Sequence, residues 1–130
     1  MGATFSTVFE SEVPQYGTLG ADHRALLDER EWIDRLATKN ELISLLAFES
    51  YAPEDTEGLL DEETQAQQPP AEWFPPEDGL SAVDALWQYL DIHSGVLAEQ
   101  AEVMEDLSGI AEELEAAQRV GVRFRFAVIM

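Results

Sequence analysis

The feature that most restricts how this chain can fold is a helical pattern that starts directly after Pro75 and Pro76. Proline is tolerated at or before a first helical turn, because the N–H that it lacks has no helical partner there in any case. Large apolar residues then recur at the three- and four-residue spacing of a helix, and they are Leu80, Val83, Leu86, Trp87 and Leu90. Gly95 follows where it can take the left-handed conformation that ends a helix. We therefore predict a helix over residues 76–92.

Apolar residues occupy most of the circumference of this predicted helix. On the side away from the leucines they are Ala82, Ala85, Tyr89 and Ile92. The polar residues form a wedge only roughly 80° wide, made of Ser81, Asp84, Gln88 and Asp91. A helix of this kind is buried by more than one neighbour. We therefore expect it to lie at the centre of the domain.

A second helix is predicted over about residues 99–119, and its apolar stripe is narrow. The stripe has four-three spacing and consists of Val103, Leu107, Ile110, Leu114 and Ala117. The opposite side is rich in acids, a pattern typical of an outer helix that packs on a single neighbour. We expect Glu105, Glu112 and Glu113 to face solvent there, and they are our candidate partner-binding residues.

Both ends of the chain have strand patterns. Residues 4–9 are β-branched and aromatic, and residues 122–130 alternate between two faces. With a further helix predicted over residues 21–38, the sequence indicates one α+β domain over residues 1–130. In this fold the N- and C-terminal strands form a small sheet with antiparallel pairing, and about three to four helices pack on it.

Two segments are less regular. Residues 41–48 are short and apolar, which suits a buried strand and a short helix equally, and both assignments stay open. Residues from about 51 to 73 contain Pro53, Pro69 and Pro70, several glutamines and many acids, but few large aliphatic residues. This composition predicts an acidic surface excursion.

Charge is the strongest global signal in the sequence. The chain has 27 acidic and 7 basic residues, which gives a formal net charge of −20 at pH 7. Phosphates would be repelled, so neither nucleic acid nor an anionic membrane is an expected partner. The basic residues lie at positions 24–39 and 119–125 only. Two interpretations remain, a solvated coat that keeps the protein soluble and an acidic face that binds a basic protein partner.

Composition also limits the cellular setting. The chain has no cysteine, which excludes disulfides and thiolate metal sites and fits a reducing cytoplasm. No apolar run approaches the ~18 residues of a membrane span. Residues 1–13 lack the basic start and the long apolar core of a signal peptide. These features predict a cytoplasmic protein.

No catalytic motif is recognisable. The sequence has no glycine-rich phosphate loop, no nucleophile elbow and no pair of histidines at metal-ligand spacing, so we predict neither a cofactor nor a metal. Arg123 and Arg125 are two residues apart and fall on one face of the predicted strand. Further candidates for an anion-binding cleft with these arginines are His93, Tyr89 and Trp73. The competing interpretation is that both arginines pair with acids of neighbouring helices.

Three stretches of the C-terminal half form a recognisable set of motifs. They read W-F-P-P-E-D-G-L-x-x-V-x-A-L-x-x-Y-L at 73–90, D-L-x-x-I-x-x-x-L-x-x-A at 106–117 and G-V-R-F-R-F-A-V at 121–128. In these motifs the chain resembles a small bacterial family whose members have about this length and no assigned function. Pro75 departs from the family pattern, in which a polar capping residue is more usual. The resemblance implies a fold and a bacterial source, and it assigns no activity and no catalytic residue.

Two classes of function are compatible with these features. The leading hypothesis is a non-enzymatic, acidic protein-interaction domain of the immunity or inhibitor type, because the charge is high and no catalytic motif is visible. The alternative is a small-ligand binder or enzyme that uses Arg123, Arg125 and His93. A deep pocket that joins these three residues would favour the alternative, and a flat acidic face would favour the interaction domain.

Overall fold

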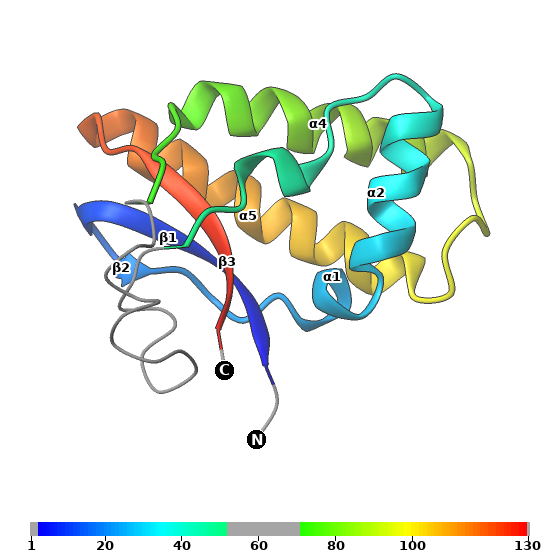
Figure 1. Cartoon of the computed structure of the whole chain (residues 1–130), viewed down its shortest axis with the longest axis horizontal. Coiled ribbons are helices and arrows are strands. Elements are labelled where there is room, and N and C mark those ends of the chain that lie inside the picture. Colours follow the sequence, from blue (N-terminus) through cyan, green and yellow to red (C-terminus); the bar gives the residue numbers. More distant parts are fainter. Residues whose placement is uncertain (1–2, 52–70, 130) are drawn as a thin grey trace, which may run out of the picture.

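The computed structural model describes residues 3–51 and 71–129 of the chain. Its elements are, in chain order, the strands β1 (Thr4–Val13) and β2 (Gly17–Leu19), the helices α1 (Arg24–Asp28) and α2 (Arg30–Lys39), the short 3-10 helix η1 (Leu45–Phe48), the helices α4 (Pro76–Ile92) and α5 (Gln100–Val120), and the strand β3 (Phe124–Ile129). The strands form a sheet on one side of the molecule and the helices gather on the other (Figure 1), which is the predicted α+β fold. Residues 52–70, most of the predicted acidic excursion, lie outside the described residues.

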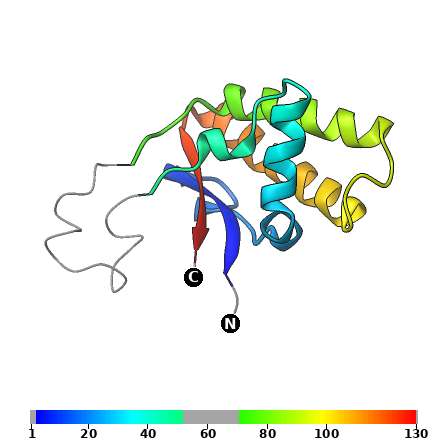
Figure 2. The same cartoon turned by 45° about the vertical axis from the view of Figure 1, so that its right-hand side comes forward.

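The sheet has three antiparallel strands in the order β2-β1-β3. β1 and β3 pair from Thr4↔Ile129 to Phe9↔Phe124. The two ends of the described chain therefore lie side by side in one sheet, as predicted (Figure 2). β1 extends four residues beyond the predicted strand, to Val13, because its outer half forms a hairpin with β2.

A cluster of phenylalanine rings attaches η1 and the start of α4 to the sheet. Phe48 lies 5.3 Å from Phe74 and 5.5 Å from Phe124, measured between ring centroids. Phe126 packs on Phe5 at 5.2 Å. The backbones of Phe74 and Phe124 also exchange two hydrogen bonds of 2.8 and 3.0 Å. This pairing covers the outer edge of β3 at that point, where an open edge would invite pairing with other chains.

Two predicted segments have a finer structure than their sequences indicate. The predicted helix over residues 21–38 is two helices, because the chain turns at Glu29 between α1 and α2. The turn leaves Trp32 on the surface, 60% exposed. Residues 41–48, for which strand and helix were equally suitable, end in the 3-10 helix η1, and the Ser44 hydroxyl accepts a hydrogen bond from the N–H of Leu46 at its start.

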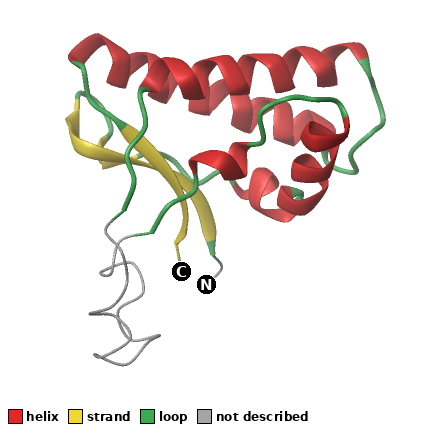
Figure 3. Cartoon of the chain, turned by 45° about the horizontal axis from the view of Figure 1, so that its top comes forward, coloured by secondary structure: helices red, strands yellow, loops and turns green. Residues whose placement is uncertain are grey.

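The central helix is α5 and not α4. α5 contacts α4 and also α1 and β1, and its fully buried apolar side chains are Val103, Leu107, Ile110, Leu114 and Ala117. Figure 3 shows α4 and α5 side by side. α4 contacts chiefly α5, and Ile92 at its end is 77% exposed. The prediction that residues 76–92 form the centre is therefore wrong. Counting apolar positions around the circumference misleads here, because Ala85 and Tyr89 are only half-buried.

Leu107→Ala should lower the free energy of unfolding more than Leu86→Ala, although both side chains are buried. Large-to-small core substitutions cost about 2–5 kcal/mol, and the cost is highest where the surroundings cannot collapse into the cavity. α5 is held by α4, α1 and β1 together, whereas α4 can shift toward α5 from its exposed side. Denaturant unfolding of both variants, with unchanged slopes, measures the two losses. Equal losses, or a larger loss for Leu86→Ala, would place the centre of the core at α4.

Candidate functional site

Four of the five predicted anion-binding residues form two separate pairs, and Arg123 pairs with another residue. At the sheet, the guanidinium of Arg125 lies 5.0 Å from the centre of the Trp73 ring, and Arg125 is only 4% exposed. Its Nη1 donates to the carbonyl oxygen of Ser50 at 2.7 Å. Arg123 is exposed instead, and its Nε donates to Glu10 Oε1 at 2.9 Å. Arg125 therefore joins β3 to the segments that contain Ser50 and Trp73. Arg123 pairs with an acid of β1.

His93 and Tyr89 form the second pair, at the far end of α4. Their rings are stacked with centroids 4.1 Å apart, and His93 Nδ1 lies 3.0 Å from the carbonyl oxygen of Tyr89. α4 has 17 residues, so its two ends are ~25 Å apart. Trp73 precedes its first turn and His93 follows its last. The structure thus does not bring His93 together with Arg123 and Arg125.

A further set of polar contacts attaches the chain after η1 to α2 and β3. Arg30 Nε donates to Glu49 Oε2 at 2.8 Å, and the Tyr51 hydroxyl donates to Glu49 Oε1 at 2.7 Å. Burial, followed by this hydrogen bond, raises the pKa of Tyr51 to about 12. The hydroxyl therefore keeps its proton at neutral pH, and its oxygen accepts from the N–H of Val128 at 3.0 Å. These groups are used within the fold.

The acids predicted on the back of the second helix do not share one environment. Glu105 and Glu112 are exposed, as expected, whereas Glu113 is 1% exposed. The expectation that Glu113 faces solvent is therefore wrong, and its carboxylate is not accessible to a partner. The exposed acids of α5 form a strip at helical spacing, which we call the α5 acidic strip, and they are Glu102, Glu105, Glu112 and Glu115.

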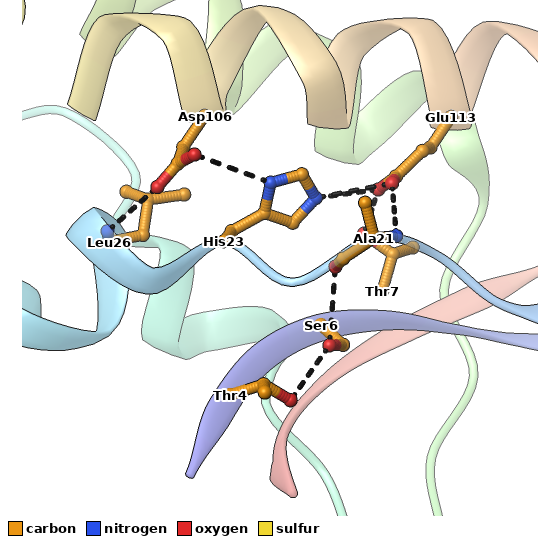
Figure 4. A network of polar contacts seen from close by, with 8 residues as sticks. All are labelled: Thr4, Ser6, Thr7, Ala21, His23, Leu26, Asp106 and Glu113. Atoms are coloured by element: carbon orange, nitrogen blue, oxygen red, sulfur yellow. Dashed lines mark hydrogen bonds and ion pairs between the residues drawn. The ribbon is translucent and has the colours of Figure 1, made fainter. Parts of the chain in front are cut away.

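The buried Glu113 carboxylate is the centre of a polar network (Figure 4). It accepts hydrogen bonds from the Thr7 hydroxyl at 2.9 Å and from the N–H of Ala21 at 2.8 Å. His23 Nε2 lies 3.0 Å from Glu113 Oε1, and this nitrogen donates because an ionised carboxylate only accepts. Each oxygen of Glu113 thus has a donor, as a buried charge requires.

The same histidine reaches a second carboxylate on α5. His23 Nδ1 lies 3.8 Å from Asp106 Oδ1, and Asp106 Oδ2 accepts from the N–H of Leu26 at 3.1 Å. Figure 4 shows the ring of His23 between the two acids, along one side of α5. The two carboxylates, Asp106 and Glu113, therefore hold both the loop before α1 and the first turn of that helix against α5.

Residues of these types serve as acids and bases in many enzymes, but this network is enclosed. Thr7, His23 and Glu113 are at most 3% exposed. A Cβ at Gly20 would lie 2.6 Å from the Glu113 carboxylate, and one at Gly109 would lie 3.2 Å from His23 Cε1. Chain atoms therefore crowd the network on two sides, and its arrangement fits a structural role.

An open hollow lies beside α2, away from the network of His23, Asp106 and Glu113. Two adjoining parts of about 360 and 270 Å³ share Trp32, Val96 and Leu97. We call the whole the α2 groove. Its larger part is lined by Trp32, Arg35, Lys39, Tyr89, Val96 and Leu97, and Glu29 lines its smaller part. Sequence patterns gave no hint of a groove here, although Trp32 lies off the apolar stripe of its helix.

No group of three or more histidine or acidic side chains with the geometry of a metal site occurs in residues 3–51 and 71–129. Over the same ranges, no helix is both long and apolar enough to cross a membrane. No family model, curated protein or solved structure matches this chain. The bacterial source that the motifs imply stays a prediction, and function has to be inferred from geometry and charge.

Several carboxylates lie close together at the start of α5, around Glu99. The N–H of Glu99 donates to Glu29 Oε1 at 3.2 Å. Desolvation, followed by repulsion from Asp28, Glu29 and Glu102, raises the pKa of the Glu99 carboxyl. The folded protein therefore binds a proton at Glu99 more tightly than the unfolded chain does.

Glu113→Ala should lower the free energy of unfolding by about 3 kcal/mol, because it leaves buried donors of Thr7, Ala21 and His23 without an acceptor. Glu112→Ala is the matched control, since it makes the same change at the adjacent, exposed position of α5 and should shift stability by no more than about 0.5 kcal/mol. Denaturant unfolding compares the two. Similar losses for both variants would mean that the network adds little to stability.

Glu99→Gln should stabilise the protein at pH 7, and the gain should vanish in acid. An acid whose pKa is raised by folding destabilises the folded state while it is charged, and this penalty disappears as the pH falls below the ordinary value of 4.5. Unfolding free energies at pH 7 and about pH 4 measure the change. Glu115→Gln, at the far end of α5, is the control. A gain that persists or grows at the lower pH would contradict the assigned repulsion.

Proposed function

We propose that this protein is a non-enzymatic, cytoplasmic protein-interaction domain that binds a basic protein partner through the α5 acidic strip. An inhibitor or immunity protein is the type of activity that such a surface would serve, because it can cover a basic active site or nucleic-acid-binding face of another protein. The observation that carries the proposal is the strip itself, four exposed glutamates along one helix.

Two properties of α5 support this assignment. The opposite side of the helix is fully buried, so packing against α4, α1 and β1 fixes the backbone positions from which the four charges project. A backbone that is already ordered loses little conformational entropy on binding. The chain also has no basic residue between Lys39 and Arg119, so the helix carries almost none of the countercharge that would neutralise the strip internally.

The alternative of a small-ligand binder or enzyme has less support. It requires Arg123, Arg125 and His93 in one site, and α4 separates His93 from both arginines. Arg123 is paired with Glu10, and Arg125 is buried against Ser50 and Trp73. A ligand would have to displace contacts that hold the sheet to neighbouring segments.

Neutralising the strip should abolish capture of a basic partner and leave the fold intact. The strip variant carries Glu→Gln at positions 102, 105, 112 and 115. The control removes the same number of charges from exposed acids outside α5, with Glu→Gln at 12, 31 and 72 and Asp→Asn at 91. Both variants and the wild type serve as baits in quantitative affinity purification from the native cell. We expect wild type and control to enrich the same basic protein, and the strip variant to lose it.

With the recovered partner, the association rate should fall as salt shortens the Debye length below ~10 Å. The strip variant should associate slowly at every salt concentration. Equal capture by the strip variant, or an association rate that ignores both salt and the substitutions, would reduce the strip to a coat that keeps the protein soluble.

A further inference from the structure

Most basic side chains of this acidic protein are occupied within the fold. Arg24, Arg30 and Arg123 pair with Asp28, Glu49 and Glu10, and Arg125 is buried at the sheet. In residues 3–51 and 71–129 the bases without an ion pair are Arg35, Lys39 and Arg119. Two of these three lie one turn apart on α2, and both line the α2 groove.

The groove combines these cations with aromatic and aliphatic surface. The guanidinium of Arg35 lies 5.2 Å from the centre of the Trp32 ring, in a cation–π contact. Trp32 is 60% exposed and Val96 44% exposed. Together with Leu97 they give the groove apolar surface beside two positive charges. Figure 1 shows α2 near the connection between α4 and α5, which supplies the opposite wall.

The shape of the groove favours a segment of chain over a small molecule. Its larger part, of about 360 Å³, lies at the lower end of the range for enclosed ligand pockets. It is open along its length, since it continues into the adjoining part of about 270 Å³, which Glu29 and Ala98 also line. Sites for small molecules bury most of the ligand surface, whereas a peptide needs only a furrow with anchors for some side chains.

We propose that the α2 groove binds an acidic peptide segment of a protein partner that also carries a large apolar side chain. Carboxylates of the segment would receive charge-assisted hydrogen bonds from Arg35 and Lys39. The apolar side chain would pack on Trp32, Val96 and Leu97. Tryptophan and arginine are the residues that most often dominate binding energy at interfaces, and here they adjoin at the surface.

The charge of the rest of the protein makes this recognition selective. With a net charge of −20, the domain repels an acidic segment in most orientations. Attraction occurs where carboxylates reach Arg35 and Lys39, so the segment is held in one place and direction. The proposal stands apart from the α5 acidic strip, because it concerns another helix and a partner of opposite charge.

Selection from a displayed library of random peptides of about a dozen residues on the immobilised wild-type protein tests this proposal. Enriched peptides should combine Asp or Glu with Leu, Phe or Trp. A synthetic peptide of the enriched sequence, labelled for fluorescence anisotropy, then gives affinities for the variants. Arg35→Gln with Lys39→Gln, and separately Trp32→Ala, should each weaken binding at least about tenfold.

The matched control is Arg24→Gln with Arg119→Gln, which removes the same charge from exposed helical positions outside the groove. It should change the affinity less than about twofold. Denaturant unfolding confirms that each variant is folded. The proposal is overturned if no peptide or only basic peptides are enriched, or if groove and control variants bind alike. It is also overturned if the protein self-associates and Arg35→Gln with Lys39→Gln abolishes the dimer, since the occupant is then a second copy.

Discussion

The rest of this structure depends on one buried charge, the carboxylate of Glu113. Removing a carboxylate from water costs several kcal/mol unless hydrogen bonds satisfy its oxygens. Here the donors come from Thr7 on β1, Ala21 in the loop after β2 and His23 before α1. All three must arrive together, and a side chain at position 20 would collide with the carboxylate. The carboxylate therefore fixes the register between the sheet, the loop and α5 in a way that apolar packing alone does not.

This register determines what the rest of α5 can present. Glu113 and the apolar stripe occupy the inner side of the helix, so Glu105 and Glu112 must point outward. A slip of α5 along or around its axis would expose the buried carboxylate's partners and bury strip charges that have none. Stability and the geometry of the acidic strip thus have the same cause, because the packing that buries Glu113 also sets where the strip residues lie on the surface.

Sequence patterns within a single segment correctly predicted the elements that depend only on neighbouring residues. A proline start and a glycine stop bounded α4, and alternation identified both terminal strands. The position of Glu113 required knowledge of a histidine 90 residues away, so it read as one more surface acid. One signal was present, because Glu113 follows Ile110 by three residues and precedes Ala117 by four and so borders the stripe. The sequence grouped Arg125, Trp73 and His93 as candidates for one cleft; Arg125 and Trp73 are in contact, whereas the position of His93 depends on the direction in which α4 leaves the sheet.

The distribution of bases shows why the α2 groove is unusual for this chain. With 27 acids for 7 bases, an exposed cation meets an acid readily, and Arg30 and Arg123 do so. Arg35 instead lies over Trp32, a contact that holds the guanidinium without neutralising it. The turn at Glu29 creates this situation, because it sets α2 apart from α1 and leaves Trp32 outside the core. An exposed tryptophan with a cation held beside it is the surface that the proposed acidic peptide segment would contact.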